Sequence, residues 1–183
     1  PEKVLVIGDS LFSDIWGGKR NNMKTLITGG RIITPDGIID GWLLYEDGKI
    51  LEIGTGECPS AYEIIDAEGR YVSPGFIDIH THGAGGADYM DGTVDAYLTA
   101  AKMSARHGAT LVFPTTLTSS NEVLFDTFDL YEAAVAANTE GAAFGGLHLE
   151  GPYFNPAQAG AQDPRYLRNP QPEDYLEILS RSN

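Results

Sequence analysis

The stretch "SPGFIDIHTHGAGG", residues 73–86, separates two kinds of sequence pattern in this chain. Before it, short runs of β-branched and aromatic residues alternate with Asp-Gly and Glu-Gly turn signals, which predicts strands. After it, apolar runs alternate with amphipathic segments, as in parallel βα units. We therefore expect an α/β protein, with a small antiparallel, β-sandwich-like domain over residues 23–72 and a βα region over residues 73–183.

The clearest turn of the β-domain lies in "YEDGKILEIG", residues 45–54. Asp47 and Gly48 tolerate the positive φ angles of a tight two-residue turn. We therefore expect an antiparallel hairpin whose two strands flank these residues.

Residues 73–183 contain three apolar runs that are typical of buried strands, namely "GFIDIH" at 75–80, "ATLVFPTT" at 109–116 and "AAFGGLHLEG" at 142–151. Helices are expected over about 93–107, after a capping box formed by Ser119 and Glu122, and from about Pro172. In the second helix, apolar residues recur at helical spacing on one face, at Leu124, Phe128, Tyr131 and Val135. A closed barrel needs roughly 200 residues or more, so this region predicts the first three βα units of an incomplete TIM-type (β/α)8 barrel.

Composition excludes several classes of partner. The formal net charge is −14, and no basic cluster is longer than "GGKRNN". Nucleic acid and anionic membrane surfaces are therefore not expected as partners. Cys58 is the single cysteine, so no intrachain disulfide can form, and there is no signal-like or membrane-spanning apolar run. A cytoplasmic protein is the simplest expectation.

Polar residues at the ends of two predicted strands are candidate metal ligands. Side chains two residues apart on a strand point to the same side, so His80 and His82 can converge on one ion. Glu150 lies at the end of the third predicted strand, and functional groups of βα folds gather at the carboxyl ends of strands. Imidazole and carboxylate groups suit zinc and similar divalent ions.

Other interpretations of these residues stay open at this point. The two histidines could simply close a strand in a glycine-rich loop, and Glu150 could cap a neighbouring helix. His148 shares the face of Glu150 and is expected to have a supporting or core role. His107 lies at a predicted helix end, where a cation opposes the helix dipole, so we interpret it as structural.

Two segments resemble a known family. "PGFIDIHTHG", residues 74–83, is similar to the signature of the amidohydrolase superfamily, and "GLHLEGPYFNPAQAGAQDP", residues 146–164, resembles N-acetylglucosamine-6-phosphate deacetylases. The resemblance implies that Glu150 is the principal metal ligand and that His80 and His82 form a second metal position. It implies one or two divalent ions, zinc or else iron.

The resemblance also implies an activity, which is hydrolysis of the acetamido group of N-acetylglucosamine 6-phosphate to glucosamine 6-phosphate and acetate. The family's Gly-x-His element, read here as Gly160-Ala161-Gln162, places Ala161 and Gln162 at the substrate, although glutamine cannot titrate. The family's general acid and base, an aspartate from the last barrel strand, has no counterpart in residues 1–183. We therefore expect an amino-terminal portion that is inactive alone and belongs to a homodimer when full-length.

Alternatives to this activity are a truncated or scaffold chain without catalysis, and an amidohydrolase that acts on a different amide. Residues 1–22 stand apart from both. They resemble the last motif of haloacid-dehalogenase-type phosphatases, in which Asp9 and Asp14 would be magnesium ligands. The nucleophile motif Asp-x-Asp-Gly-Thr occurs nowhere, so a gene fusion, a start at Met23, or a strand added to the β-domain are the preferred explanations.

Overall fold

The computed structural model describes residues 4–7, 24–46 and 49–181, with the backbone alone for residues 4–7. The chain divides into two compact units. The first comprises residues 1–77 and 108–111, and the second comprises residues 78–107 and 112–183. Asp9, Asp14 and the turn residues Asp47 and Gly48 lie outside the described residues.

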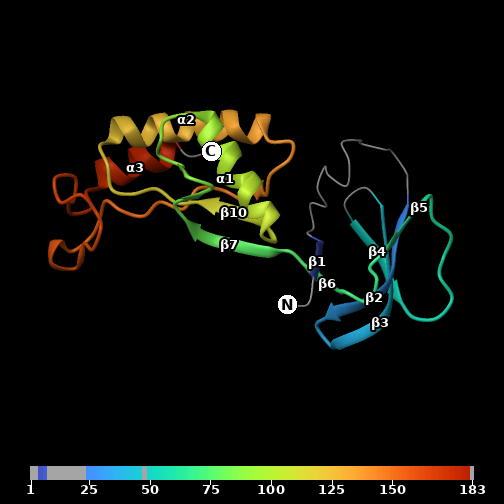
Figure 1. Cartoon of the computed structure of the whole chain (residues 1–183). Helices are drawn as coiled ribbons and strands as arrows, with labels where there is room; N and C mark the ends of the chain where they lie inside the picture. The colour runs from blue at the N-terminus through green and yellow to red at the C-terminus, as the bar shows by residue number, and fades with distance from the viewer. Residues whose placement is uncertain (1–3, 8–23, 47–48, 182–183) are drawn as a thin grey trace. The chain divides into compact units, whose positions relative to one another are not determined.

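The first unit is built on a six-stranded sheet (Figure 1). Its strands are β1 (Val4–Ile7), β2 (Thr25–Thr34), β3 (Gly37–Glu46), β4 (Lys49–Gly54), β5 (Glu63–Asp66) and β6 (Tyr71–Pro74). The order is β1-β6-β2-β3-β4, and β5 pairs with β2 beside this path. The expected hairpin is confirmed, because β3 and β4 pair antiparallel with Glu46 opposite Lys49.

The expectation of a purely antiparallel β-domain is wrong. Strands β2, β3 and β4 pair antiparallel, but β2 pairs parallel with β5 and then with β6, and β1 also pairs parallel with β6. The change of partner along β2 coincides with a register shift between Ile27 and Gly30, where Gly29 has a φ of 66°. Apolar alternation predicts strands but not their direction, which is why the sequence missed this arrangement.

Apolar side chains pack on both faces of this sheet. Successive residues of a strand point to opposite faces, so neighbours such as Leu26 and Ile27 join different clusters. One cluster contains Leu26, Trp42 and Leu44, and the other contains Ile27, Ile32, Leu43, Tyr45, Ala67 and Val72. Each face of the sheet therefore carries a cluster of buried apolar side chains, and this burial stabilises the sheet.

The second sheet has the order β11-β10-β7, from β7 (Phe76–Thr81), β10 (Ala109–Pro114) and β11 (Ala143–Phe144). The N–H of Phe76 donates to the carbonyl of Gly108, and the N–H of Thr115 donates to that of Thr81. Strands β7 and β10 thus run in the same direction, as expected for βα units. A small hairpin of β8 (Gly83–Ala84) and β9 (Ala87–Asp88) follows β7.

The third predicted strand is much shorter than expected. Only Ala143–Phe144 forms a strand, and His148 makes an isolated parallel bridge with Thr115. Gly145 and Gly146 interrupt it: Gly146 has a φ of 137°, and Gly145 lies so close to Phe113 that an added Cβ would be 2.6 Å from the ring. Glu150 therefore lies in a loop beyond the bridge rather than on a strand.

Three helices belong to the second unit and lie on one side of β7 and β10 in Figure 1. They are α1 (Val94–Arg106), α2 (Asn121–Ala137) and α3 (Pro172–Arg181), and a short 3-10 turn covers Pro156–Gln158. The prediction for α1 is confirmed to within one residue at each end, because Thr93 caps its start and His107 its end. The three helices have neither the length nor the apolar character of a membrane span across the part of the chain that the structure describes.

The predicted start of α2 is off by one residue. Ser120, not Ser119, is the N-cap, and its hydroxyl accepts the N–H of Val123. Of the predicted apolar stripe, Leu124 and Phe128 are buried, but Val135 is 46% exposed. Ala134 is buried in its place, because the helix turns 100° per residue and the helical stripe drifts across the packing face.

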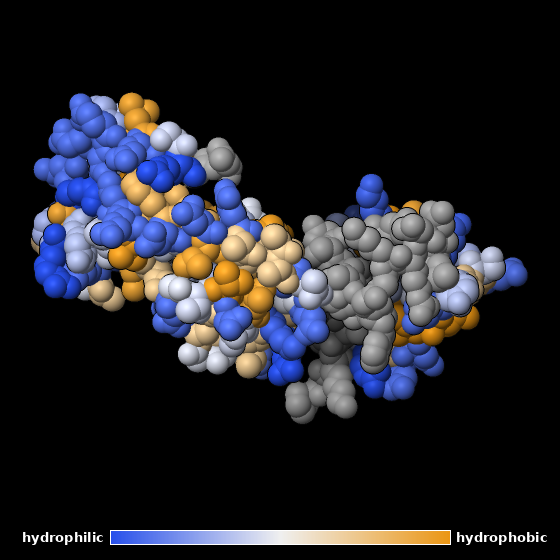
Figure 2. All heavy atoms as spheres, turned by 90° about the horizontal axis from the view of Figure 1, so that it is seen from above, coloured by the Kyte–Doolittle hydropathy of each residue, from blue (hydrophilic) through white to orange (hydrophobic). Residues whose placement is uncertain are grey.

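Large apolar side chains remain uncovered on β7, which is an open edge of its sheet. Phe76, Ile77 and Ile79 are each at least 60% exposed. Figure 2 likewise shows apolar atoms exposed between polar ones on the face it presents. Strand β7 is at the edge of its sheet, so both its backbone and its side chains are open for further packing.

Candidate metal centre

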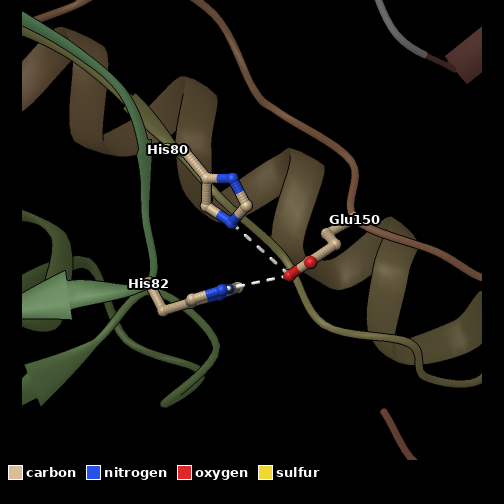
Figure 3. A group of neighbouring side chains, drawn as sticks. All are labelled: His80, His82 and Glu150. Carbon is tan, nitrogen blue, oxygen red and sulfur yellow. Dashed lines mark ion pairs between the residues drawn. The ribbon is translucent and has the colours of Figure 1, made fainter. Parts of the chain in front are cut away.

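The three residues predicted as metal ligands come together in the structure (Figure 3). His80 is the penultimate residue of strand β7, and His82 follows that strand directly. Glu150 comes from the loop beyond the bridge at His148. The Nε2 atoms of His80 and His82 lie 3.6 Å and 3.1 Å from the same oxygen, Oε2 of Glu150. One ligand atom from each residue lies within 4.8 Å of the others, so a single ion could reach all three.

The orientation of His82 is set by its second ring nitrogen. Its Nδ1 is 3.2 Å from the backbone carbonyl of Thr115. A carbonyl can only accept, so Nδ1 carries a hydrogen. In the neutral ring, Nε2 then presents its lone pair to Glu150. Two electron-rich atoms facing each other at 3.1 Å repel unless a proton or a cation lies between them. This donor set therefore fits a divalent cation.

Thr115 connects the strand ends beneath the metal ligands, and the sequence analysis missed it. It is fully buried, its hydroxyl accepts the N–H of Thr81 at 3.0 Å, and it donates to the carbonyl of Phe113 at 3.1 Å. The same hydroxyl is 3.3 Å from Nδ1 of His148. Its position at the end of the second predicted strand was the available signal, because that strand ends at the same rim as His80.

His148 contacts this cluster without joining the group of three. Its ring lies edge-on to that of His80, with centroids 4.8 Å apart, and its backbone carbonyl accepts the N–H of Thr116. This placement agrees with the supporting role expected from the sequence. His107 is at the end of α1, as expected, with its N–H directed at the carbonyl of Ser104.

Ala161 and Gln162, the residues expected at the substrate, differ in exposure. Ala161 is exposed, whereas Gln162 is buried. The side-chain oxygen of Gln162 accepts the N–H of Thr118 at 2.7 Å, which ties the loop to the segment after β10. Gly151 also lies against Thr118, so closely that an added Cβ would be 2.0 Å from the hydroxyl oxygen. The loop that carries Glu150 is thus held at Thr118 from two points.

A polar cluster lies at the far end of this loop, and we call Asn121, Tyr153, Arg168 and Asp174 the Asp174 cluster. Arg168 binds Asp174 through two nitrogens, with Nε 2.5 Å from Oδ2 and Nη2 2.8 Å from Oδ1. Tyr153 donates to Oδ2 at 2.8 Å, and Asn121 donates to Oδ1 at 3.0 Å. The cluster joins the loop to the first turns of α2 and α3.

These contacts shift two pKa values. Hydrogen bonding to the Arg168 guanidinium lowers the pKa of Asp174 to about 2. Burial, and then the hydrogen bond to Asp174, raises the pKa of Tyr153 to about 12. Asp174 is therefore ionised and Tyr153 protonated over the whole physiological pH range.

The low pKa of Asp174 predicts a loss of stability in acid. The pKa of Asp174 is lower in the folded chain than the ordinary value, so its contribution is complete above about pH 4 and disappears as the pH falls through about 2. Between pH 4 and pH 2, we expect the free energy of unfolding to fall in both the wild-type chain and Asp174→Asn. The fall should be larger in the wild-type chain by on the order of 1 kcal/mol. Urea unfolding at a series of pH values measures this, and equal slopes for the two chains would contradict it.

Comparison with known proteins shows which protein family this chain resembles. A sequence profile described as "Amidohydrolase family" matches residues 63–148. N-acetylglucosamine-6-phosphate deacetylases are 32% identical over 156 residues in Lysinibacillus sphaericus and 33% over 150 residues in Bacillus subtilis. The resemblance to the amidohydrolase superfamily is confirmed. The resemblance of residues 1–22 to phosphatases stays a prediction.

The matched regions cover 83% and 78% of this amidohydrolase-like chain, respectively, but 38% of each bacterial relative. The human N-acetylglucosamine-6-phosphate deacetylase is 29% identical over 167 residues, which are 90% of this chain and 37% of the relative. The chain thus spans about two fifths of the length of the curated relatives it matches.

Solved structures agree with the sequence relatives. The deacetylase of Mycobacterium smegmatis in complex with N-acetyl-D-glucosamine-6-phosphate is 27% identical, with a TM-score of 0.75 over 87% of this chain and 41% of that one. The deacetylase of Pasteurella multocida gives a TM-score of 0.78 at 25% identity, over 86% and 42% of the two chains. A dihydropyrimidinase of Brevibacillus agri gives 0.55 at 29% identity, over 73% and 28%. The chain therefore has a mixed α/β fold similar to that of amidohydrolases.

The amidohydrolase resemblance carries an implication for cofactors. It implies a divalent metal, and the chain brings a His-His-Glu group together within the range of one ion. The chemistry of this group agrees with that implication, because two imidazole nitrogens and a carboxylate oxygen are ordinary ligands of divalent transition metals.

Proposed function

We propose that this chain forms part of a metal-dependent deacetylase that converts N-acetylglucosamine 6-phosphate to glucosamine 6-phosphate and acetate. The observation that carries the proposal is the convergence of His80, His82 and Glu150, from segments about 70 residues apart in sequence, in a chain similar to such deacetylases. Deacetylase structures superpose with higher TM-scores than the dihydropyrimidinase does, which favours amide hydrolysis of an amino sugar.

In this proposal Glu150 is the principal ligand, and His80 and His82 complete the site for zinc, with iron as the alternative. The ion supplies a Lewis acid that polarises the amide carbonyl and makes a water molecule more acidic. The chain's own residues orient the ligands: the carbonyl of Thr115 fixes the ring of His82, and Asp78 accepts the N–H of His80 at 3.1 Å. These contacts favour a preformed site, because they come from the chain's own backbone and side chains.

The substrate contacts that we propose are those of Ala161 and Gln162. The side-chain oxygen of Gln162 already accepts from Thr118, which leaves its NH2 group as the part that can donate to the sugar. Ala161 is exposed and contributes through its backbone. Residues that handle protons at the leaving amine are proposed to lie in the region of the relatives that this chain does not match.

The finer architecture is also a proposal. We propose that residues 23–72 form the small β-domain and that residues 73–183 contribute the first three βα units of a (β/α)8 barrel. The exposed apolar side chains of β7 support this, because a neighbouring strand and helix would bury them. A homodimer is proposed for the full-length protein.

Substrate hydrolysis tests the function. The complete product of the reading frame and the 183-residue chain are assayed for acetate release from N-acetylglucosamine 6-phosphate with zinc or ferrous iron. We expect turnover by the complete product and none by residues 1–183 alone, because the proton-handling aspartate is proposed to lie elsewhere. N-acetylgalactosamine 6-phosphate and a dihydropyrimidine serve as competing substrates. A preference for the dihydropyrimidine would exclude the deacetylase assignment.

A further inference from the structure

The carboxylate of Glu150 owes its position to a loop rather than to a regular strand. The last backbone pairing before it is at His148, whose N–H donates to Pro114 and whose carbonyl accepts from Thr116. Gly151, directly after Glu150, has a φ of 95°. The loop from residue 150 to residue 168 contains no helix or strand apart from one short 3-10 turn. Contacts from outside the loop must therefore hold the carboxylate in place.

The Asp174 cluster is connected to Glu150 through a short segment of chain. Tyr153 is three residues after Glu150, and its hydroxyl donates to Asp174. Arg168, at the other end of the loop, donates its backbone N–H to the carbonyl of Pro152 at 3.2 Å. Asp174 thus binds both ends of the loop at once, one through Tyr153 and the other through Arg168.

Apolar packing alone leaves this loop incompletely held. Leu149 and Tyr153 are only partly buried, where they pack against a cluster of Leu124, Phe128 and Ile178 from α2 and α3. The side chains of Arg168 and Asp174 are 30% and 17% exposed, so their hydrogen bonds are largely shielded from water. Shielded, doubly bonded Arg–carboxylate pairs define geometry more strongly than exposed pairs do.

We infer that Asp174 is a positioning residue for the metal centre. By gathering Tyr153 and Arg168 against Asn121, it holds the two ends of the loop of residues 150–168 on the first turns of α2 and α3. In this arrangement the carboxylate of Glu150 faces His80 and His82. This inference rests on the proposed function for the identity of the bound ion. The ordering of the loop is inferred from the contacts of Asp174 alone.

The experiment compares Asp174→Asn with Asp163→Asn in the 183-residue chain. Asp163 also pairs with an arginine of the same loop, but its partner Arg165 is two residues away and is exposed. Hydrogen–deuterium exchange of residues 150–168 is measured against residues 24–46 as the reference, and zinc affinity is measured by competition with a chelator. Asp174→Asn should accelerate exchange in the loop about tenfold and weaken zinc binding about tenfold, whereas Asp163→Asn changes neither by more than about twofold.

Two further variants separate positioning from general destabilisation. Ala100→Gly in α1 removes a buried methyl group far from the loop and should lower the melting temperature without changing zinc affinity. Tyr153→Phe removes one hydrogen bond to Asp174 and keeps the Arg168 pair, so it should give a smaller effect of the same kind even where Asp174→Asn fails to fold. Unchanged loop exchange in both Asp174→Asn and Tyr153→Phe overturns the inference.

A different result is expected if the proposed function is wrong. In that case the wild-type chain binds no zinc, yet the exchange difference between Asp174→Asn and Asp163→Asn still appears and supports the ordering role of Asp174. Normal zinc affinity in a folded Asp174→Asn chain, with wild-type loop exchange, overturns the inference and leaves the deacetylase proposal intact.

Discussion

Glu150→Gln is expected to lower zinc affinity at least about a hundredfold and to abolish deacetylation by the complete protein. The amide that replaces the carboxylate carries no negative charge. The Nε2 atoms of His80 and His82 stay 3.6 Å and 3.1 Å from the position of the lost oxygen. Removing the one anionic ligand of the three therefore removes most of the attraction for a divalent cation. Zinc stoichiometry is measured after dialysis, and zinc affinity is measured by calorimetric titration.

The matched control for this change is Glu140→Gln. Glu140 is an exposed carboxylate that pairs with Lys102 on the surface, where ion pairs contribute little. Its replacement should leave zinc binding and activity unchanged. A Glu150→Gln chain that keeps wild-type zinc affinity would show that the ion is held elsewhere.

Gly151→Ala should produce the largest loss of stability among single changes in the loop, about 2–4 kcal/mol in the free energy of unfolding. Two costs add here. The φ of 95° is unfavourable for any residue with a Cβ, and the new Cβ would lie 2.0 Å from Oγ1 and 3.3 Å from Cα of Thr118. The backbone must shift to relieve this, and Glu150 is the adjacent residue. We therefore expect zinc affinity to fall as well, measured alongside urea unfolding.

Gly160→Ala separates the two costs. Gly160 also has a positive φ, 61°, but nothing lies within 4 Å of the position of its Cβ. Only the backbone cost remains, about 1 kcal/mol, with no effect on zinc. The double variant Gly151→Ala, Thr118→Ala should recover about 1–2 kcal/mol, because it removes the hydroxyl that the new Cβ meets. An equal cost for Gly151→Ala and Gly160→Ala would argue against close packing at Thr118.

Local signals in the sequence located several elements well. Helix α1 was predicted to within one residue because Thr93 and His107 mark its ends chemically, and the β3–β4 hairpin followed from alternating apolar residues around a turn signal. The candidate ligands could also be predicted from the sequence. His80 and His82 share one side of a strand, and Glu150 lies at the end of the third apolar run. These features depend on spacings of a few residues.

Features that depend on distant partners escaped prediction. The parallel pairing of β2 with β5 and β6 has no local signature, and apolar runs of this length occur in both kinds of sheet. Gln162 was expected at the substrate because of its place in a motif, but its burial against Thr118 is decided by a contact across 44 residues. The Asp174 cluster joins residues from two helices and a loop, so no pattern within any one of them predicts it.

Strand β1 has a consequence for synthesis on the ribosome. Its pairing partner within the described residues is β6, with Val4 opposite Tyr71, and β6 also closes the sheet against β2. The partner of β1 within the described residues is therefore made about 70 residues later, on the order of ten seconds afterwards. During that time β2, β3 and β4 can pair as a local meander, and the arrival of β6 converts this meander into the finished sheet.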